Sequence, residues 1–377
     1  MSAVATAEDR APLRRAIELA WLGRGAVSPN PLVGAVLLAR GEVIGEGHHA
    51  ELGGAHAERA AIEDCRRRGH DPAGATLYVS LEPCAHHGRQ PPCTEAILAA
   101  GVARVVIGCD DPSENASGRG PGILRDEGVQ VAFADGAEAS AARLLNQPFR
   151  KHARTGLPHV VLKQAASLDG RTATASGDSR WISGPQSRAL VHRWRAEVDA
   201  VAVGIATALA DDPQLTAREL EPRPRRQPLR VVFDSRARLP LDSRLLGSLD
   251  EAPVLVVTSE AAPAERVAAL RDAGAELLAV GGEPPAQVAA ALAALGRREV
   301  TSLLLEGGAT LAGAFLDAGE IDELRVFVAP LVLGGAGDRP LLAGRGGSLV
   351  GSAPRALSLE AEPCGEDVLL RARLREW

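Results

Sequence analysis

The sequence predicts an α/β protein built from two successive domains. Stretches with apolar residues at helical spacing alternate with short aliphatic runs, which is the pattern of α/β folds. The length of 377 residues suits two or three domains of ordinary size. A basic, polar stretch over residues 150–156 interrupts the alternation. We interpret it as the linker between a domain of residues 1–150 and a domain of residues 151–377.

The first domain is expected to begin with a helix over residues 11–22 and a β-hairpin formed by the runs 33–38 and 43–47. The elements expected next are a helix at 56–67, a strand at 76–80, a helix at 94–100 and a strand at 102–107. After residues 123–131 the periodicity fades into the basic stretch taken as the linker.

The second domain is expected to restart with a strand at 159–165 and a helix at 187–197. Further strands are expected at 200–203, 230–233, 254–258, 300–305, 324–329 and 368–374, with a helix at about 310–318. Strands and helices therefore alternate in this half as well.

Composition excludes several classes of function. There are 42 Lys and Arg residues against 48 Asp and Glu, a formal net charge of −6, so the basic surface of a nucleic-acid-binding protein is missing. No apolar run approaches the ~18 residues needed to cross a bilayer, and Glu8 and Asp9 stand where a signal peptide would be apolar. We expect a cytoplasmic protein with no nucleic-acid or membrane partner. The 5 cysteines, odd in number and unevenly spaced, argue against a disulfide framework and allow a metal site.

One histidine and two cysteines in the first domain predict a catalytic zinc site. His56 opens a helix, and Cys84 and Cys93 lie in a strand-to-helix loop. Three such ligands leave a fourth position for water, whose pKa the metal would lower. Glu58 could carry a proton from that water to a leaving amine, as in zinc deaminases. The alternative is a pair of isolated thiols beside a solvated glutamate.

The residues around this site resemble a known family. Pro-Cys-x-His-x-Gly-Arg-x-Pro-Pro-Cys at 83–93, with Asn-Pro-Leu-Val-Gly at 30–34 and Gly-His-His at 47–49, resembles the deaminase half of the bifunctional deaminase/reductases of riboflavin biosynthesis. The resemblance implies a cytidine-deaminase-like, three-layer domain that deaminates a diaminopyrimidine ribonucleotide 5′-phosphate. It also implies that four residues line the substrate pocket: Asn30, His49, His86 and Arg89, the last as a partner for the phosphate.

The second domain gathers polar residues at strand ends, where ligands bind in open α/β sheets. Leu305-Glu306-Gly307-Gly308 joins a strand to a helix start whose amides suit a pyrophosphate, although a Gly-Gly turn also serves plain chain reversal. Ser235 and Arg236 follow another strand, as the 2′-phosphate of NADP would require. The chain has no Gly-x-Gly-x-x-Gly fingerprint, which disfavours a standard Rossmann site.

Segments 162–171, 181–184, 209–216 and 305–308 resemble the reductase half of the same family, which has a dihydrofolate-reductase-like fold. The resemblance implies that NADPH reduces a ribosyl group to ribityl. The positions it matches to NADPH contacts are Ala165, Trp181, Thr207, Asp211, Ser235 and Gly308. The positions it matches to substrate contacts are Ser179, Arg195, Leu215, Arg218 and Glu306.

Lys163 is a candidate catalytic residue of the reductase half. It is one of only two lysines, Lys151 and Lys163, and lies at a strand end beside the expected cofactor. We hypothesise that Lys163, with Glu306 nearby, polarises the substrate carbonyl, and that Arg195 and Arg218 hold the phosphate. The alternative for Lys163 is a strand-end side chain that extends its ammonium into solvent.

Two other functions stay open at this point. One is a zinc deaminase of another nucleoside or nucleotide, or of tRNA, with a non-catalytic C-terminal half; the acidic net charge and the insert with Arg89 count against it. The other is a non-catalytic chain with structural zinc, against which the open fourth position and Glu58 count. The expected partner is a small pyrimidine nucleotide, and we expect the chain to form a homo-oligomer.

Overall fold

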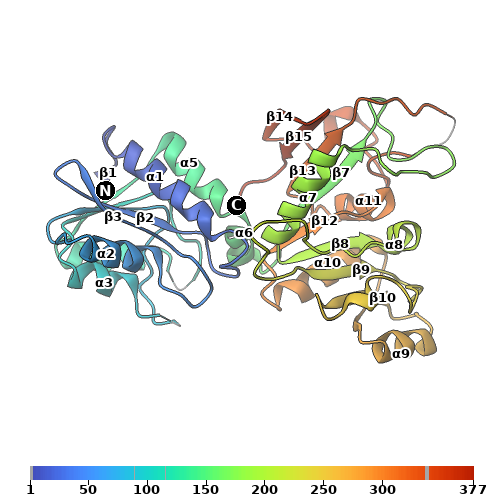
Figure 1. Cartoon of the computed structure of the whole chain (residues 1–377), viewed down its shortest axis with the longest axis horizontal. Coiled ribbons are helices and arrows are strands. Elements are labelled where there is room, and N and C mark those ends of the chain that lie inside the picture. Colours follow the sequence, from blue (N-terminus) through green and yellow to red (C-terminus); the bar gives the residue numbers. More distant parts are fainter. Residues whose placement is uncertain (1–2, 89, 115, 336–338) are drawn as a thin grey trace. The chain divides into compact units, whose positions relative to one another are not determined.

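The computed structural model describes residues 3–88, 90–114, 116–335 and 339–377 (Figure 1). The chain divides into two compact units, Met1–Thr155 together with Trp377, and Gly156–Glu376. The division falls after Thr155, at the end of helix α6 (Gln147–Thr155). No helix of the described residues is long and apolar enough to cross a membrane.

The boundary between the two units lies within the predicted linker stretch 150–156, but this stretch is helical, since helix α6 covers it almost entirely and helix α5 (Gly136–Leu145) precedes it. The buried side of α6 carries charged residues: Arg150 and Lys151 are each 1% exposed. A helix that buries charge rather than aliphatic side chains does not show the apolar periodicity from which helices are predicted.

The first unit contains a six-stranded sheet in the order β1-β6-β5-β4-β2-β3. Its strands are β1 (Ala3–Val4), β2 (Gly34–Ala39), β3 (Glu42–His48), β4 (Thr76–Val79), β5 (Arg104–Ile107) and β6 (Gln130–Phe133). The helices before α5 are α1 (Arg10–Ala20), α2 (Ala57–Arg67), α3 (Cys93–Ala99) and α4 (Arg119–Asp126). The predicted hairpin is confirmed, because β2 pairs antiparallel with β3.

Successive side chains of β2 point to opposite faces of this sheet and enter separate cores. Leu37 packs with apolar residues of α2, α3 and α4, including Ile97. Val36 packs against Leu13 and Leu19 of α1. Helices therefore cover both faces, with α1 and α5 on one side and α2 and α3 on the other (Figure 1). The expected three-layer architecture is confirmed.

The second unit contains a nine-stranded sheet in the order β11-β10-β9-β8-β12-β7-β13-β15-β14. Its strands are β7 (His159–Ala166), β8 (Ala200–Gly204), β9 (Leu229–Phe233), β10 (Val254–Ser259), β11 (Glu276–Val280), β12 (Ser302–Leu305), β13 (Glu323–Val328), β14 (Ser358–Cys364) and β15 (Asp367–Arg373). Its helices are α7 (Pro185–Glu197), α8 (Ile205–Asp211), α9 (Ala264–Asp272), α10 (Pro284–Gly296) and α11 (Ala309–Asp317).

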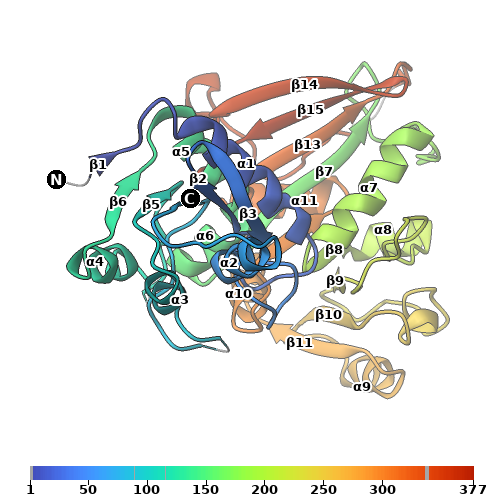
Figure 2. The same ribbon diagram turned by 60° about the vertical axis from the view of Figure 1, so that its left-hand side comes forward.

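This sheet is parallel from β11 to β13 and antiparallel where β15 and β14 follow. Figure 2 shows β7, β13, β15 and β14 side by side. Leu162 of β7 faces a core made with α10 and α11, whereas Val161 faces one made with α7, α8 and α9. Both faces of the sheet are thus covered, which explains the continuous aliphatic runs from which most of its strands were predicted. Strands β11 and β14 were not predicted.

Candidate functional sites

Three elements bring the predicted zinc ligands together in the first unit. His56 caps the N-terminus of α2, Cys93 is the first residue of α3, and Cys84 lies in the loop after β4. His56 Nδ1 is 3.2 Å from Cys93 Sγ and 3.6 Å from Cys84 Sγ. The three ligand atoms all lie within 4.8 Å of one another. Such spacing fits a single ion held by all three.

The chemistry of the donors fits zinc. Hydrogen bonds involving Cys93 and His56 lower the pKa of the Cys84 thiol to about 4, against the opposing effect of burial. The backbone N–H of Cys93 also donates to Cys84 Sγ over 3.3 Å. A thiolate is the form of cysteine that binds zinc. The loop therefore favours the ionised form of Cys84 that can bind the metal. One imidazole and two sulfurs leave one tetrahedral corner for solvent or substrate.

Glu58 stands in the first turn of α2, next to these ligands, and is only 3% exposed. Burial raises the pKa of its carboxyl to about 7, and the neighbouring Cys84 sulfur adds to the rise. A group with a pKa near the working pH can both accept and release a proton. The environment of Glu58 therefore suits a residue that carries a proton. A solvated helix residue would have no such raised pKa.

Asn30 and His49 are placed beside the ligands. His49 Nδ1 donates to the Ala55 carbonyl over 3.0 Å, so Nε2 is the acceptor for the Asn30 amide at 3.1 Å. The His49 and His56 rings lie edge to face with centroids 5.3 Å apart. The predicted pocket residues Asn30 and His49 thus form one hydrogen-bonded unit against a zinc ligand.

The insert between the two cysteines is more exposed. His86 is exposed, and His87 pairs with Glu95 at 3.3 Å. Gln90 donates to the Gly53 carbonyl over 3.0 Å, which ties the insert to the loop after β3. Arg89, the predicted phosphate partner, lies outside the described residues.

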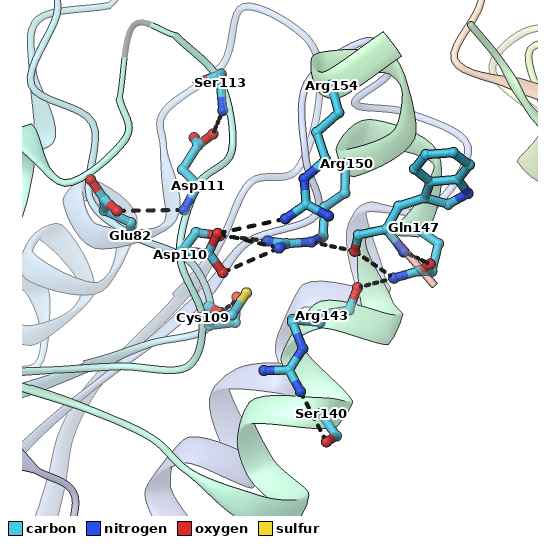
Figure 3. A network of polar contacts seen from close by, with 12 residues as sticks. Glu82, Cys109, Asp110, Asp111, Ser113, Ser140, Arg143, Gln147, Arg150 and Arg154 are labelled. Carbon is cyan, nitrogen blue, oxygen red and sulfur yellow. Dashed lines mark hydrogen bonds and ion pairs between the residues drawn. The ribbon is translucent and has the colours of Figure 1, made fainter. Parts of the chain in front are cut away.

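A polar network joins the loops that follow β4 and β5 to helix α6 (Figure 3). Glu82, 4% exposed, accepts a hydrogen bond from the Gly118 amide over 2.7 Å. The Arg150 guanidinium points toward Asp110, with Nη1 2.6 Å from its carbonyl and Nη2 3.1 Å from Oδ1. Arg150 Nε also donates to the Trp377 carbonyl over 2.7 Å. Helix α6, which sequence analysis missed, thereby anchors the loop that follows β5.

The second unit contains a cavity of about 1320 Å³. Lys163 and all the positions matched to NADPH and substrate contacts line it. On the expected cofactor side these are Ala165, Trp181, Thr207, Asp211, Ser235 and Gly308. On the expected substrate side they are Lys163, Ser179, Arg195, Leu215, Arg218 and Glu306. The structure thus brings together residues that lie up to 145 positions apart in the chain, from Lys163 to Gly308.

Of the two arginines predicted to hold phosphate in this cavity, Arg195 forms a close ion pair and Arg218 does not. Burial opposes ionisation of Glu306, but its ion pair with Arg195 outweighs burial and holds the pKa of the carboxyl below its ordinary value. Arg218 is more open, with 44% of its side chain exposed and Glu219 3.8 Å away. Of the two arginines predicted to hold phosphate, Arg218 is therefore the less committed to a protein partner.

Lys163 contributes a cation without an ion-pair partner among the described residues. Burial lowers the pKa of its ammonium, with Glu306 opposing the shift and Arg195 adding to it. Nζ lies 5.9 Å from the centre of the Phe327 ring. The side chain lines the cavity instead of extending into open solvent, which favours a role toward a bound ligand.

Arg236 is exposed and is not among the residues that line the cavity, whereas Arg238 and Arg244 do line it. The chain turns at Ala237, whose φ is 54°. The suggestion that Arg236 supplies the guanidinium beside Ser235 is therefore wrong. Arg238, two positions further along the chain, reaches the cavity instead.

Two polar residues of this cavity, Gln164 and His192, were not predicted from the sequence. Gln164 Nε2 donates to the Gly307 carbonyl over 3.0 Å and to the Leu341 carbonyl over 3.1 Å, so it fixes the turn before Gly308. Its position next to Lys163 on a strand was the available signal. His192 lines the cavity from α7, one helical turn before Arg195.

Two family models match the chain. The model described as RibD C-terminal domain matches residues 158–370, and the model described as cytidine and deoxycytidylate deaminase zinc-binding region matches residues 6–109. The curated riboflavin biosynthesis protein RibD of Escherichia coli (strain K12) is 40% identical over 373 residues, covering 96% of this chain and 98% of the relative. That of Mycobacterium tuberculosis (H37Rv) is 42% identical over 325 residues, covering 85% and 84%.

Solved structures agree over the same length. One form of Acinetobacter baumannii RibD has a TM-score of 0.83 at 38% identity, covering 98% of this chain and 99% of that one. The deaminase/reductase of Thermotoga maritima, described as acting on diaminohydroxyphosphoribosylaminopyrimidine and 5-amino-6-(5-phosphoribosylamino)uracil, has a TM-score of 0.84 at 36% identity, with the same coverage. The similarity therefore spans both units.

Proposed function

The chain belongs to the RibD family, and on that premise we propose how its residues divide the work of two consecutive reactions. It is an enzyme of riboflavin biosynthesis that combines a zinc-dependent deaminase with an NADPH-dependent reductase. The alternative of a non-catalytic C-terminal half is not favoured, because the RibD C-terminal domain model matches residues 158–370. We assign the deaminase to Met1–Thr155 and the reductase to Gly156–Glu376.

In the deaminase, His56, Cys84 and Cys93 would hold zinc, which would supply a Lewis acid for activating the water that attacks the amino-bearing ring carbon. Glu58 accepts a proton from the attacking water and delivers it to the departing nitrogen. A carbon–oxygen bond forms, the carbon–nitrogen bond breaks, and ammonia leaves. Asn30 still has one amide hydrogen and its carbonyl oxygen to offer the substrate, because its contact with His49 uses only Nδ2.

His86 and Arg89 complete the substrate site of the deaminase in this proposal. Arg89 pairs with the 5′-phosphate, because a guanidinium can donate two parallel hydrogen bonds to a phosphate. The support for both residues is their position in the insert between Cys84 and Cys93.

In the reductase, NADPH bound in this cavity would supply the hydride for reduction of the carbonyl carbon of the open-chain sugar. Ala165, Trp181, Thr207, Asp211, Ser235 and Gly308 form the side of the cavity that receives the cofactor. Lys163 polarises the carbonyl oxygen and donates a proton to it as the alcohol forms, a transfer that the lowered pKa of its ammonium favours. Glu306 helps to keep Lys163 protonated until then.

Ser179, Arg195, Leu215, Arg218 and Glu306 form the substrate side of that cavity. Arg218 is the main phosphate partner, because Arg195 already donates to Glu306 through two of its nitrogens. Arg195 retains one N–H on each terminal nitrogen for the substrate. The observation that carries the reductase assignment is the convergence of all these positions on one cavity.

The expected surroundings of the enzyme follow from composition and surface. We propose a cytoplasmic enzyme, in keeping with its five free cysteines, Cys65, Cys84, Cys93, Cys109 and Cys364. Nucleic acid is not a partner in this proposal, given the net charge of −6.

The proposed homo-oligomer forms through the edge strand β14, because the unpaired backbone groups of an edge strand can pair with a second chain. Two leucines support this: Leu359 of β14 is 68% exposed, and Leu357, which precedes the strand, is 62% exposed.

Supplying the purified chain with the diaminopyrimidine ribonucleotide phosphate and NADPH tests the function. Ammonia should appear and NADPH absorbance should fall, one equivalent each per substrate consumed. Ammonia release with constant NADPH would leave a deaminase without the second reaction and would contradict the proposal.

A further inference from the structure

His192 and Arg195 share one anchor in the reductase cavity. His192 Nδ1 lies 3.2 Å from the backbone carbonyl oxygen of Thr216, and Arg195 Nη1 donates to the same oxygen over 3.2 Å. A carbonyl oxygen only accepts hydrogen bonds, so Nδ1 must carry the ring hydrogen. The contact therefore fixes both the orientation and the tautomer of the His192 ring.

The other ring nitrogen is left to the cavity. No described residue forms a hydrogen bond with His192 Nε2, and this atom is not among the polar atoms sealed from solvent. Burial, with Arg195 and Arg218 adding to it, lowers the pKa of His192, while Thr216 and Glu219 oppose the shift. The ring is thus neutral near neutral pH, and Nε2 is a hydrogen-bond acceptor.

The neighbours of His192 indicate which part of a ligand it meets. Arg195 and Arg218 both interact electrostatically with the ring, and both are proposed substrate contacts, with Arg218 on the phosphate. A neutral acceptor does not attract phosphate oxygens, which are acceptors themselves. The group adjoining a 5′-phosphate in the substrate is the sugar chain, whose hydroxyls are donors.

We propose that His192 is a specificity-determining residue of the reductase, whose Nε2 accepts a hydrogen bond from a sugar hydroxyl of the substrate. The inference rests on the proposed reductase function and deepens it. A site built to accept from a hydroxyl discriminates against analogues that lack it, because the protein group is then left without its partner. His192 thereby helps to select a ribosyl over a deoxyribosyl substrate.

Two substitutions in the full chain separate the ring nitrogens. In His192→Asn the side-chain amide occupies the Nδ1 position and can still donate to Thr216, but nothing replaces Nε2. In His192→Gln the longer amide reaches the Nε2 position and can accept there. We expect Asn to raise the KM for the deaminated ribosyl substrate roughly tenfold, with unchanged KM for NADPH, ammonia release and melting temperature. Gln should restore most of the affinity.

Deoxyribosyl analogues complete the test. For the analogue that lacks the bonded hydroxyl, wild type and His192→Asn should have the same KM. An unchanged KM for the ribosyl substrate in His192→Asn overturns the inference, as does an equal loss in both variants accompanied by a lower melting temperature. Failure of the wild-type chain to oxidise NADPH with the ribosyl substrate would instead overturn the proposed reductase function.

Discussion

Arg195 and Glu306 form a two-pronged ion pair, with Nε 2.6 Å from Oε1 and Nη2 2.8 Å from Oε2. The side chains are only 12% and 10% exposed. Residues 111 positions apart thus meet at one point of the cavity. Each charge depends on the other, since a buried charge without its partner is costly.

Removing Glu306 should therefore destabilise the second unit. We expect Glu306→Ala to lower the free energy of unfolding by about 3 to 5 kcal/mol, because Arg195 is left buried and uncompensated. Thermal and urea unfolding of the full chain measure this loss. Glu276→Ala is the matched control: it breaks the exposed pair with Arg298, 2.8 Å long, and should cost about 1 kcal/mol or less. Equal losses in the two variants would contradict the argument.

Lys163→Met should slow hydride transfer roughly 100-fold, because it removes the group that we propose polarises and protonates the carbonyl oxygen. Single-turnover oxidation of NADPH with the deaminated substrate measures the step. Ammonia release by the same variant is the internal control and should stay at the wild-type rate. An unimpaired hydride-transfer rate would exclude the catalytic role of Lys163.

Zinc removal should abolish only the first reaction. Chelation should stop ammonia release while NADPH oxidation with the deaminated substrate continues, because the ligands lie in the first unit and the cavity in the second. Cys93→Ser should lower zinc content below stoichiometry, whereas Cys364→Ser, at a cysteine outside the ligand group, should retain the metal. Full deaminase activity in zinc-free protein would refute the assignment.

Asp9 should make the first unit sensitive to acid. The Arg104 guanidinium, bonded to both carboxylate oxygens at 2.7 and 2.8 Å, holds the pKa of Asp9 well below its usual range, with burial opposing and Thr6 and Tyr78 assisting. Since the folded pKa is the lower one, this stabilisation is complete above the unfolded pKa of about 4. It is lost as the pH falls further toward the folded value.

Asp9→Asn should accordingly cost about 2 kcal/mol at neutral pH, and the difference from wild type should shrink below about pH 3. Urea unfolding across this pH range measures it. Asp126→Asn, at an exposed position at the end of α4, should have little effect at any pH. A difference for Asp9→Asn that grows as the pH falls would reverse the sign of the argument.

The parts of the molecule that the sequence revealed are those with a local signal. The hairpin of β2 and β3 and the strands of the second unit other than β11 and β14 follow from aliphatic runs between turns. The zinc ligands were identifiable because their residue types, order and spacing are themselves the chemical signal. The reductase positions came from family resemblance, since residues as distant as Lys163 and Gly308 carry no local sign of meeting.

The parts that were missed depend on tertiary contacts. Helix α6 buries Arg150, whose guanidinium is satisfied by Asp110 and the Trp377 carbonyl. Strand β14 lies at a sheet edge with Glu360 and Glu362 exposed, so it lacks an aliphatic run. His192 gains its significance from the Thr216 carbonyl on a separate segment. None of these partners can be inferred from neighbouring residues in the sequence.

Glu58→Gln, assayed with each of the two substrates in turn, tests most directly whether two separate sites act in series. With the diaminopyrimidine nucleotide the variant should release no ammonia and oxidise no NADPH, while still binding zinc. With the deaminated nucleotide it should oxidise NADPH at the wild-type rate. Ammonia release at the wild-type rate, or loss of NADPH oxidation with the deaminated nucleotide, would contradict the account.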